Sequence, residues 1–232
     1  MRLQLLTGGI ACTVFSAFAA AIPISTDKLT GLTGGTPQGT AIYRADLSSL
    51  GLSDLASITI NDNSSGLGGA PGQFSAFDLD GIVLSKDLCA TAACTQTMTT
   101  FNVFDYSSAI FSPGAQRATA DPKLFGTGAT GTEVDDLVAT LGSFDADSST
   151  ITPDGFLSLG DNGSISFNLT SLISTADLYL YFGEVGDNGE VAASNIEVSS
   201  TPVPVPEPTS FMLLSIGLLG LGLSRRNASQ RG

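Results

Sequence analysis

The chain has 232 residues and a formal net charge of −13, from 22 acidic and 9 basic side chains. Such a strongly acidic protein repels nucleic acid and other polyanions, which excludes nucleic-acid binding as its function. The sequence contains no histidine. The common Ser–His and Cys–His nucleophilic pairs are therefore excluded as well.

The first 21 residues have the layout of a secretory signal peptide. Arg2 is followed by an apolar run, and small residues gather at positions 17–21. Signal peptidase would cleave after Ala19 or Ala21, so we expect the protein to be exported. Residues 22–201 are long enough for one exported domain.

That domain is predicted to be all-β. Eight stretches alternate apolar and polar residues with a period of two, and clusters of Gly, Asn and Asp separate them. Together they predict an antiparallel β-sandwich of the jelly-roll type. The stretches are 40–46, 56–62, 80–86, 101–106, 156–160, 163–169, 177–185 and 194–200.

One short helix is predicted among the strands. Thr132 is placed to cap it, and Gly142 to end it. At helical spacing, Val134, Leu137, Val138 and Leu141 fall on one face.

Two of the three cysteines belong to the exported domain, because Cys12 leaves with the signal peptide. Cys89 and Cys94 are separated by four residues. After export, such a pair most simply forms a disulfide that closes a small loop. A zinc site would need further Cys or His ligands, which the sequence does not supply.

Acidic residues offer one candidate cation site. Asp78 and Asp80 are two apart on a predicted strand, so both side chains project to one face. Two such carboxylates repel each other unless they are solvated or bridged by a cation such as Ca²⁺. Asp62 and Glu184 are candidates for further oxygen ligands, which would make a structural calcium site. The alternative is that these are solvated residues chosen for turn geometry.

Two tyrosines offer a candidate sugar-binding surface. Tyr179 and Tyr181 share one face of a predicted strand. If the opposite face is core, the tyrosines stand outward as a sugar-stacking pair. The alternative is ordinary cross-strand packing.

Catalysis is not expected. Glycoside hydrolysis by carboxylates needs two carboxyl groups about 5–10 Å apart in a sugar cleft, usually one with aromatic platforms. The chain has no tryptophan and only four tyrosines. We therefore predict that the protein is not an enzyme.

The C-terminal segment, 202–232, has three parts. Prolines alternate with Val and Glu at 202–208, which predicts an extended stalk. An apolar stretch at 210–223 follows, and Arg225 and Arg226 come after it. The arginines favour the cytoplasmic side of a membrane, so the stretch is predicted to be a single transmembrane helix.

The order of these parts resembles the PEP-CTERM sorting signal. The resemblance rests on Pro206, Glu207 and Pro208, on the apolar stretch, and on the terminal arginines. It implies an inner-membrane-anchored precursor that exosortase processes near the triplet. Delivery to the cell surface or extracellular matrix of a Gram-negative-type bacterium would follow. The alternative is an ordinary C-terminal anchor.

We therefore expect an exported, exosortase-processed surface or matrix protein with a structural or interaction role. Its expected processing partners are signal peptidase and exosortase, and its membrane contact is a transient C-terminal anchor. The alternative is a carbohydrate-binding module for extracellular polysaccharide. No cofactor is expected, apart from the calcium ion considered for that module.

Overall fold

The computed structural model describes residues 21–37, 39–63, 70–149, 151–190 and 195–205. The chain divides into two compact units, Met1–Pro202 and Val203–Gly232, and the first contains every described strand. Nearly all of the predicted signal peptide lies outside the described residues, as does the predicted transmembrane stretch. Within the described ranges, no helix is both long and apolar enough to cross a membrane.

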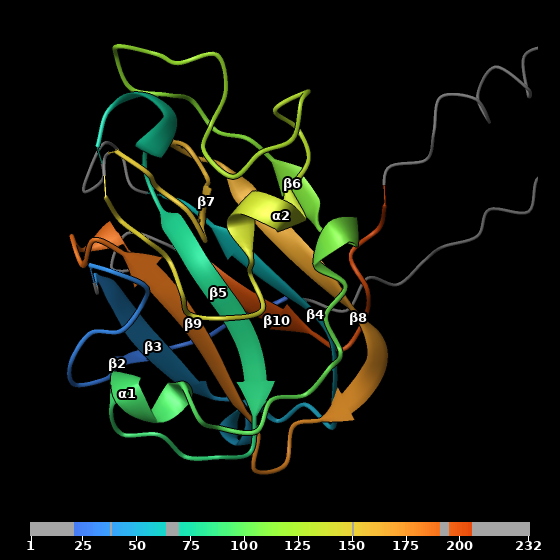
Figure 1. The fold of residues 1–232 in the computed structure, drawn as a ribbon. Coiled ribbons are helices and arrows are strands. Elements are labelled where there is room, and N and C mark those ends of the chain that lie inside the picture. The colour runs from blue at the N-terminus through green and yellow to red at the C-terminus, as the bar shows by residue number, and fades with distance from the viewer. Residues whose placement is uncertain (1–20, 38, 64–69, 150, 191–194, 206–232) are drawn as a thin grey trace, which may run out of the picture. The chain divides into compact units, whose positions relative to one another are not determined.

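The first unit consists mainly of two five-stranded sheets, in which all neighbouring strands pair antiparallel (Figure 1). The first sheet has the order β1 (Ile22–Pro23), β10 (Asn195–Ser199), β4 (Asp54–Asn61), β8 (Ser164–Ser174) and β6 (Ile110–Ser112). The second has the order β2 (Asp27–Lys28), β3 (Thr40–Asp46), β9 (Tyr179–Val185), β5 (Asp78–Ser85) and β7 (Leu157–Ser158).

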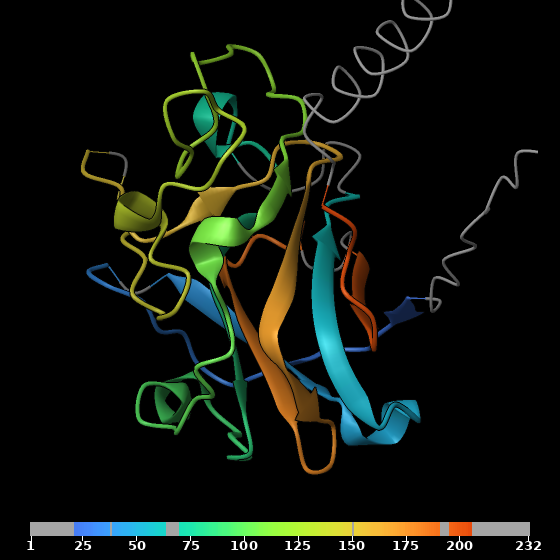
Figure 2. The same cartoon turned by 90° about the vertical axis from the view of Figure 1, so that its right-hand side faces the viewer.

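The two sheets form two layers that share one hydrophobic core (Figure 2). Alternate residues of β4 and β8, such as Ile58 and Phe167, enter the core from the first sheet. Leu84 and Phe182 enter it from the second. Alternation of apolar and polar residues therefore produces strands with one face in a common core, which is the arrangement of a β-sandwich.

Seven of the eight predicted stretches contain a strand, and β3 has the predicted bounds 40–46. The prediction of a strand at 101–106 is wrong, because residues 101–105 are irregular and a 3₁₀ turn, η3, follows at Tyr106–Ser108. Val103 and Phe104 are both buried in the core. Successive residues of a strand point to opposite faces, so burying two neighbours in one core requires a non-strand backbone.

Both faces of the second sheet are buried. Its inner face meets the core, and its outer face is covered by segments 86–98 and 140–149. A bulge in β5 between Leu79 and Ile82 shifts the alternation, so that both of these residues reach the inner face. The covering backbone comes so close that a Cβ added at Gly81 would lie 2.3 Å from the Ser143 carbonyl oxygen. Glycine is therefore required at this position.

The predicted helix at 132–142 is a single turn, α2 (Asp136–Ala139). Its N-cap is Asp135, whose carboxylate accepts a hydrogen bond from the Leu137 amide, and not the predicted Thr132. Leu137 is 90% exposed, so the predicted apolar face does not form. A helix of one turn presents no continuous stripe, and tertiary contacts decide which of its neighbours are buried.

Three further short helices lie in the connections. They are η1 (Ser48–Leu50), η2 (Gly72–Phe74) and α1 (Ala92–Thr95). Thr91 caps α1 by accepting a hydrogen bond from the Cys94 amide. Cys94 forms a disulfide with Cys89, with a Cα–Cα distance of 5.5 Å. The predicted bridge thus holds α1 and the segment before it over the outer face of the second sheet.

Candidate functional site

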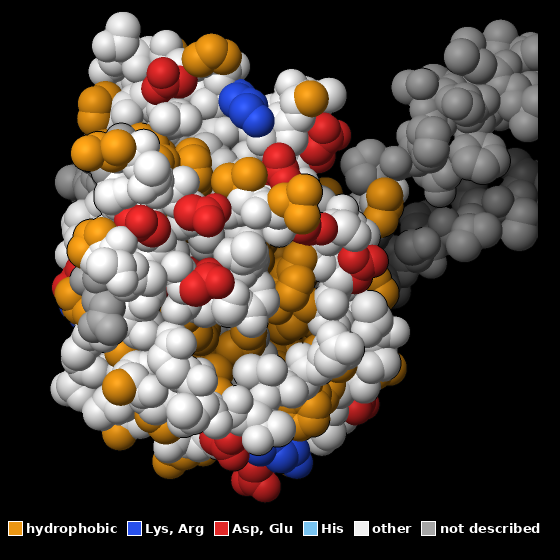
Figure 3. Space-filling view, viewed as in Figure 1, with side chains coloured by type: hydrophobic (Ala, Val, Ile, Leu, Met, Phe, Trp, Pro, Cys, Tyr) orange, Lys and Arg blue, Asp and Glu red, His pale blue; other side chains and the backbone are white. Residues whose placement is uncertain are grey.

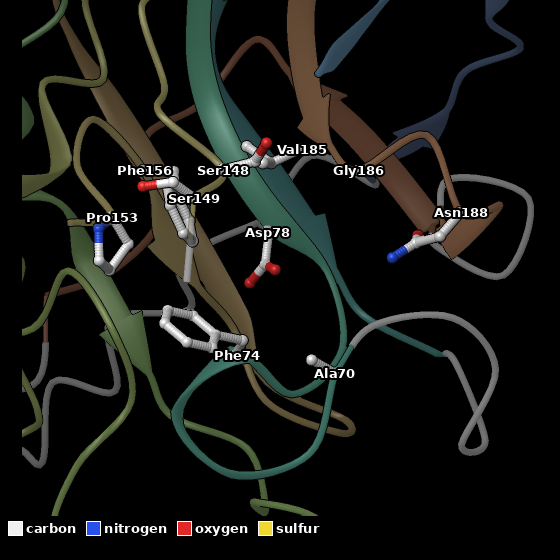
Figure 4. A pocket seen from close by; sticks show the side chains of 10 residues that line it. All are labelled: Ala70, Phe74, Asp78, Ser148, Ser149, Pro153, Phe156, Val185, Gly186 and Asn188. Carbon is white, nitrogen blue, oxygen red and sulfur yellow. The ribbon is translucent and has the colours of Figure 1, made fainter. Parts of the chain in front are cut away.

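A small pocket lies on the outer face of the second sheet, where β5 begins and β9 ends (Figure 4). Its volume is about 160 Å³. Residues from β5, from the end of β9 and the connection after it, and from two further connections line it. They are Ala70, Phe74, Asp78, Ser148, Ser149, Pro153, Phe156, Val185, Gly186 and Asn188.

Among the described residues that line this pocket, Asp78 alone has an ionisable side chain. Its side chain is nearly buried, and its carboxyl points toward the space between Phe74 and Ala70 (Figure 4). The hydroxyl of Ser158, its cross-strand neighbour on β7, donates a hydrogen bond to Oδ1. Burial raises the pKa of Asp78 well above its usual value, and the negative charge of Glu184 adds to the shift. The pocket therefore holds a carboxyl group with a fixed orientation.

Aromatic rings form the apolar wall of the pocket. The ring centroids of Phe74 and Phe156 are 6.0 Å apart, and Phe125 packs behind Phe156 at 4.4 Å. Val185 at the end of β9 joins this cluster. Because the rings support one another, the wall is in place before any ligand binds.

Asp80 has a structural role on the same face of the sheet. Its Oδ2 accepts a hydrogen bond from the Thr40 hydroxyl at 2.6 Å. Its Oδ1 accepts from the amides of Asp145 and Ala146, each at 3.1 Å. Burial raises its pKa to about 7, although these hydrogen bonds act in the opposite direction. Asp80 thus fastens the covering segment to the sheet.

A second acidic group lies at the end of the core. Glu184 follows Leu180 and Phe182 on the inner face of β9, and it is fully buried. Its Oε1 accepts a hydrogen bond from the Asn188 amide at 3.2 Å. Glu190 is also fully buried. Burial raises the pKa of Glu184 to about 7 and that of Glu190 to about 10. The charges of Asp78 and Glu184 contribute to the shift of Glu190.

Asp62 and an ion pair complete this end of the core. Asp62 comes two residues after Ile60, and its Oδ2 accepts a hydrogen bond from the Asn162 amide at 3.0 Å. Arg117 and Asp161 form a salt bridge at 2.6 Å. The charge of Arg117 acts on Asp78 and opposes the raising of that group's pKa. Acidic groups thus replace the apolar side chains where the core ends.

The predicted calcium ligands do not converge. Asp78 and Asp80 project from one face of β5, as expected, but Glu184 lies on the inner face of the neighbouring strand. Across the described residues, no three Cys, Asp or Glu side chains are placed to hold a metal ion together. Asp62 follows β4 in the other sheet, and Asp80 already accepts hydrogen bonds from three donors.

The predicted sugar-stacking pair is also not formed. Tyr181 is fully buried, where its hydroxyl donates to the Asp87 carbonyl and accepts from the Cys89 amide. Tyr179 is half-buried, and the Arg44 guanidinium lies 5.9 Å from its ring centroid. The expectation that both tyrosines stand outward is wrong, because segment 86–98 covers this face of the sheet.

A second groove is wider and more open, with a volume of about 460 Å³ between η3 and α2. Phe104, Tyr106 and Leu141 contribute apolar surface, while Asp105 and Asp136 are acidic. On the face of the molecule shown in Figure 3, acidic side chains surround exposed apolar surface and few basic ones appear. The groove lacks a buried polar group of the kind that Asp78 supplies to the smaller pocket.

The aromatic wall was not found from the sequence. The alternation at 156–160 predicts a strand that contains Phe156, and no sequence pattern marks Phe74 or Asn188 as a binding residue. Only the sheet pairing brings residues 74, 156 and 188 to one pocket, and no local pattern in the sequence encodes this.

The predicted sorting residues, Pro206, Glu207, Pro208, Arg225 and Arg226, lie outside the described residues. Comparison with known families bears on them directly: residues 204–226 match the family model for the PEP-CTERM protein-sorting motif. The chain carries a PEP-CTERM sorting motif. No curated protein and no solved structure matches the chain.

The PEP-CTERM motif implies an exported protein with a C-terminal sorting signal that exosortase processes. The matched range begins at Pro204, directly after the β domain, and contains the whole apolar stretch. The motif therefore provides information on the route of the protein. The pocket and the buried acidic groups belong to the β domain, which is the part of the protein that this motif would direct to its destination.

Proposed function

We propose that this protein is exported across the inner membrane and released by exosortase as a non-catalytic component of the cell surface or extracellular matrix. The PEP-CTERM motif at 204–226 carries the proposal. The apolar stretch holds the precursor in the membrane, and the arginines keep its end in the cytoplasm. Signal peptidase removes residues 1–21 at the other end.

The composition of the β domain supports a role outside the cell. A disulfide forms and persists in an oxidising compartment, and Cys89–Cys94 is placed to make one. The strongly acidic chain stays soluble and resists non-specific association. Such a domain serves either as a stable surface protein that repels other anionic molecules, or as the scaffold of a specific binding site.

The sorting proposal is tested with a single substitution in the motif. Glu207→Ala is expected to leave a full-length precursor in the membrane fraction of a host that contains exosortase. The wild-type protein is expected to appear outside the membrane with a shortened C-terminus. Cell fractionation and mass spectrometry of the terminus distinguish the two. Glu133→Ala, at an exposed position in the β domain, is the matched control and should behave as wild type. Release of Glu207→Ala at the wild-type level would exclude the triplet as the processing signal.

A second candidate function is binding to extracellular polysaccharide. The observation that favours it is the pocket around Asp78, where an aromatic wall faces several hydrogen-bonding groups. Calcium is not part of this candidate, since Glu184 lies on the opposite face of the second sheet from Asp78 and Asp80, and Asp62 follows a strand of the first sheet.

A further inference from the structure

The pocket around Asp78 has one apolar and one polar side. Phe74, Pro153, Phe156 and Val185 supply the apolar side. Ser148, Ser149 and Asn188 join Asp78 on the polar side. The volume of about 160 Å³ is well below the roughly 300–1,000 Å³ of pockets for drug-sized molecules. The pocket therefore has room for one small ring and not for an extended chain.

The polar side can both donate and accept hydrogen bonds. An oxygen of the Asp78 carboxyl group accepts, the Asn188 amide donates and accepts, and serine hydroxyls do either. Sugar hydroxyl groups also donate and accept, so they satisfy all of these partners. An organic ammonium ion only donates, so it can pair with the acceptors of the pocket but makes no use of the Asn188 donors.

A metal ion is a poor match for the same site. One carboxyl group lines the pocket, and no three acidic or cysteine side chains of the described segments are arranged to share an ion. Calcium takes six to eight oxygen ligands. An apolar wall of aromatic rings contributes none of these.

The apolar side matches the other half of a sugar. A pyranose ring presents C–H groups on its faces, and these pack against aromatic rings while the hydroxyl groups point outward. Phe156 packs against Phe74 and Phe125, and these two rings also contact each other. The wall is therefore preorganised, which lowers the entropic cost of binding.

We propose that the Asp78 pocket binds a single neutral sugar ring of an extracellular glycan. Asp78 and Asn188 orient its hydroxyl groups, and Phe74 and Phe156 contact its C–H face. Anionic sugars are disfavoured, because the described lining residues include the acidic side chain of Asp78 and neither Lys nor Arg. The inference rests on the second candidate function, polysaccharide binding. From the proposal of export it uses only the extracellular location of the ligand.

The test titrates the purified full-length chain, in a zwitterionic detergent free of sugar, with glucose, galactose, mannose and N-acetylglucosamine. Isothermal calorimetry is used, because it reports affinity without a label. At least one of the four is expected to bind saturably with a Kd of about 1 mM or below, equivalent to about −4 kcal/mol. Glucuronate, n-butylammonium chloride and CaCl₂ are the comparison probes.

Asn188→Ala is the informative variant, because the side chain is exposed and its backbone amide still donates to Glu184. Loss of its hydrogen bonds is expected to weaken binding about tenfold. Asn195→Ala, at an exposed position on β10, is the matched control and should bind as wild type. Phe74→Ala is a second variant that removes the apolar contact and is likewise expected to weaken binding.

Three results would overturn the inference. The first is that none of the four sugars binds at about 10 mM, ten times the expected Kd. The second is that n-butylammonium or Ca²⁺ binds tightly while the sugars do not. The third is that sugar binding is unchanged in both Asn188→Ala and Phe74→Ala. The assay uses purified protein, so its outcome is independent of whether Glu207→Ala blocks sorting.

Discussion

The two faces of the second sheet are both buried, but by different means. The inner face contributes aliphatic and aromatic side chains to the common core, including Leu84 and Phe182. The outer face is covered by irregular segments that polar side chains fasten down. Asp80 binds the segment at 145–146, and Tyr181 binds the segment at 87–89.

The difference shows how one sheet can contribute to the core with one face and hold covering segments with the other. Burial of apolar area stabilises the inner face, and this contribution tolerates changes that keep volume and shape. On the outer face, each covering segment depends on a few hydrogen bonds with fixed geometry, and an unpaired group there is costly. The outer face is also where the covering segments leave the Asp78 pocket open.

The largest effect is expected on the inner face. Leu84→Ala removes a fully buried side chain and should lower the free energy of unfolding by about 2–5 kcal/mol. Leu137→Ala is the matched control, because the same change occurs at a side chain that is 90% exposed. Its expected effect is within about 0.5 kcal/mol. Chemical denaturation of both variants measures the difference. Equal effects would mean that the inner face is not the main source of stability.

A smaller effect is expected on the outer face. Asp80→Ala leaves the Thr40 hydroxyl and the amides of Asp145 and Ala146 without their acceptor. Buried donors without partners cost about 1–3 kcal/mol each, and partial access of water should limit the total to about 2–4 kcal/mol. The covering segment should also become sensitive to protease. Asp27→Ala is the control, since this carboxylate is exposed and only loosely paired with Arg44.

Asp80→Asn separates charge from hydrogen bonding at the same site. The amide oxygen of Asn can still accept from a backbone amide, so this variant should lose less stability than Asp80→Ala. If the two variants are equally unstable, the charge of Asp80 and not its hydrogen bonds fastens the segment. Hydrogen exchange of the Asp145 and Ala146 amides provides the direct measurement.

The contrast between the two faces also explains which parts of the fold could be predicted from the sequence. Alternation in β3, β8 and β9 predicts these strands, because one face of each enters a common core. The same alternation correctly placed Asp78 and Asp80 on one face. It gave no sign that this face would be covered, so Tyr181 was expected at the surface.

The site was less accessible to sequence reasoning than the strands. Three separate connections between strands supply Phe74, Ser148 and Asn188, and only the pairing of β5 with β7 and β9 brings them together. The sorting motif is the opposite case. Its proline triplet, apolar stretch and arginines are contiguous, so the order along the chain is itself the signal.

The pH dependence of stability tests the acidic groups at the end of the core. Burial raises the pKa of Glu190 from 4.5 to about 10 and that of Glu184 from 4.5 to about 7. Above about pH 4.5 the unfolded chain releases these protons while the folded domain retains them. The folded state then binds more protons than the unfolded state, so its stability falls as pH rises. For Glu184 the fall continues to about pH 7, and for Glu190 to about pH 10.

Glu190→Gln replaces one of these carboxyl groups with an amide that does not titrate, so it reduces the difference in bound protons between the folded and unfolded states. Between about pH 5 and about pH 8, unfolding free energies of the variant should decline less steeply than those of wild type. The expected difference is at most about 1.4 kcal/mol per pH unit, the value for one proton. Glu133→Gln, at an exposed site, should leave the slope unchanged. A wild-type domain that gains stability over this range would show that Glu190 is ionised in the fold. The inner face would then end in a charged group that its neighbours stabilise, and the contrast with the hydrogen-bonded outer face would largely disappear.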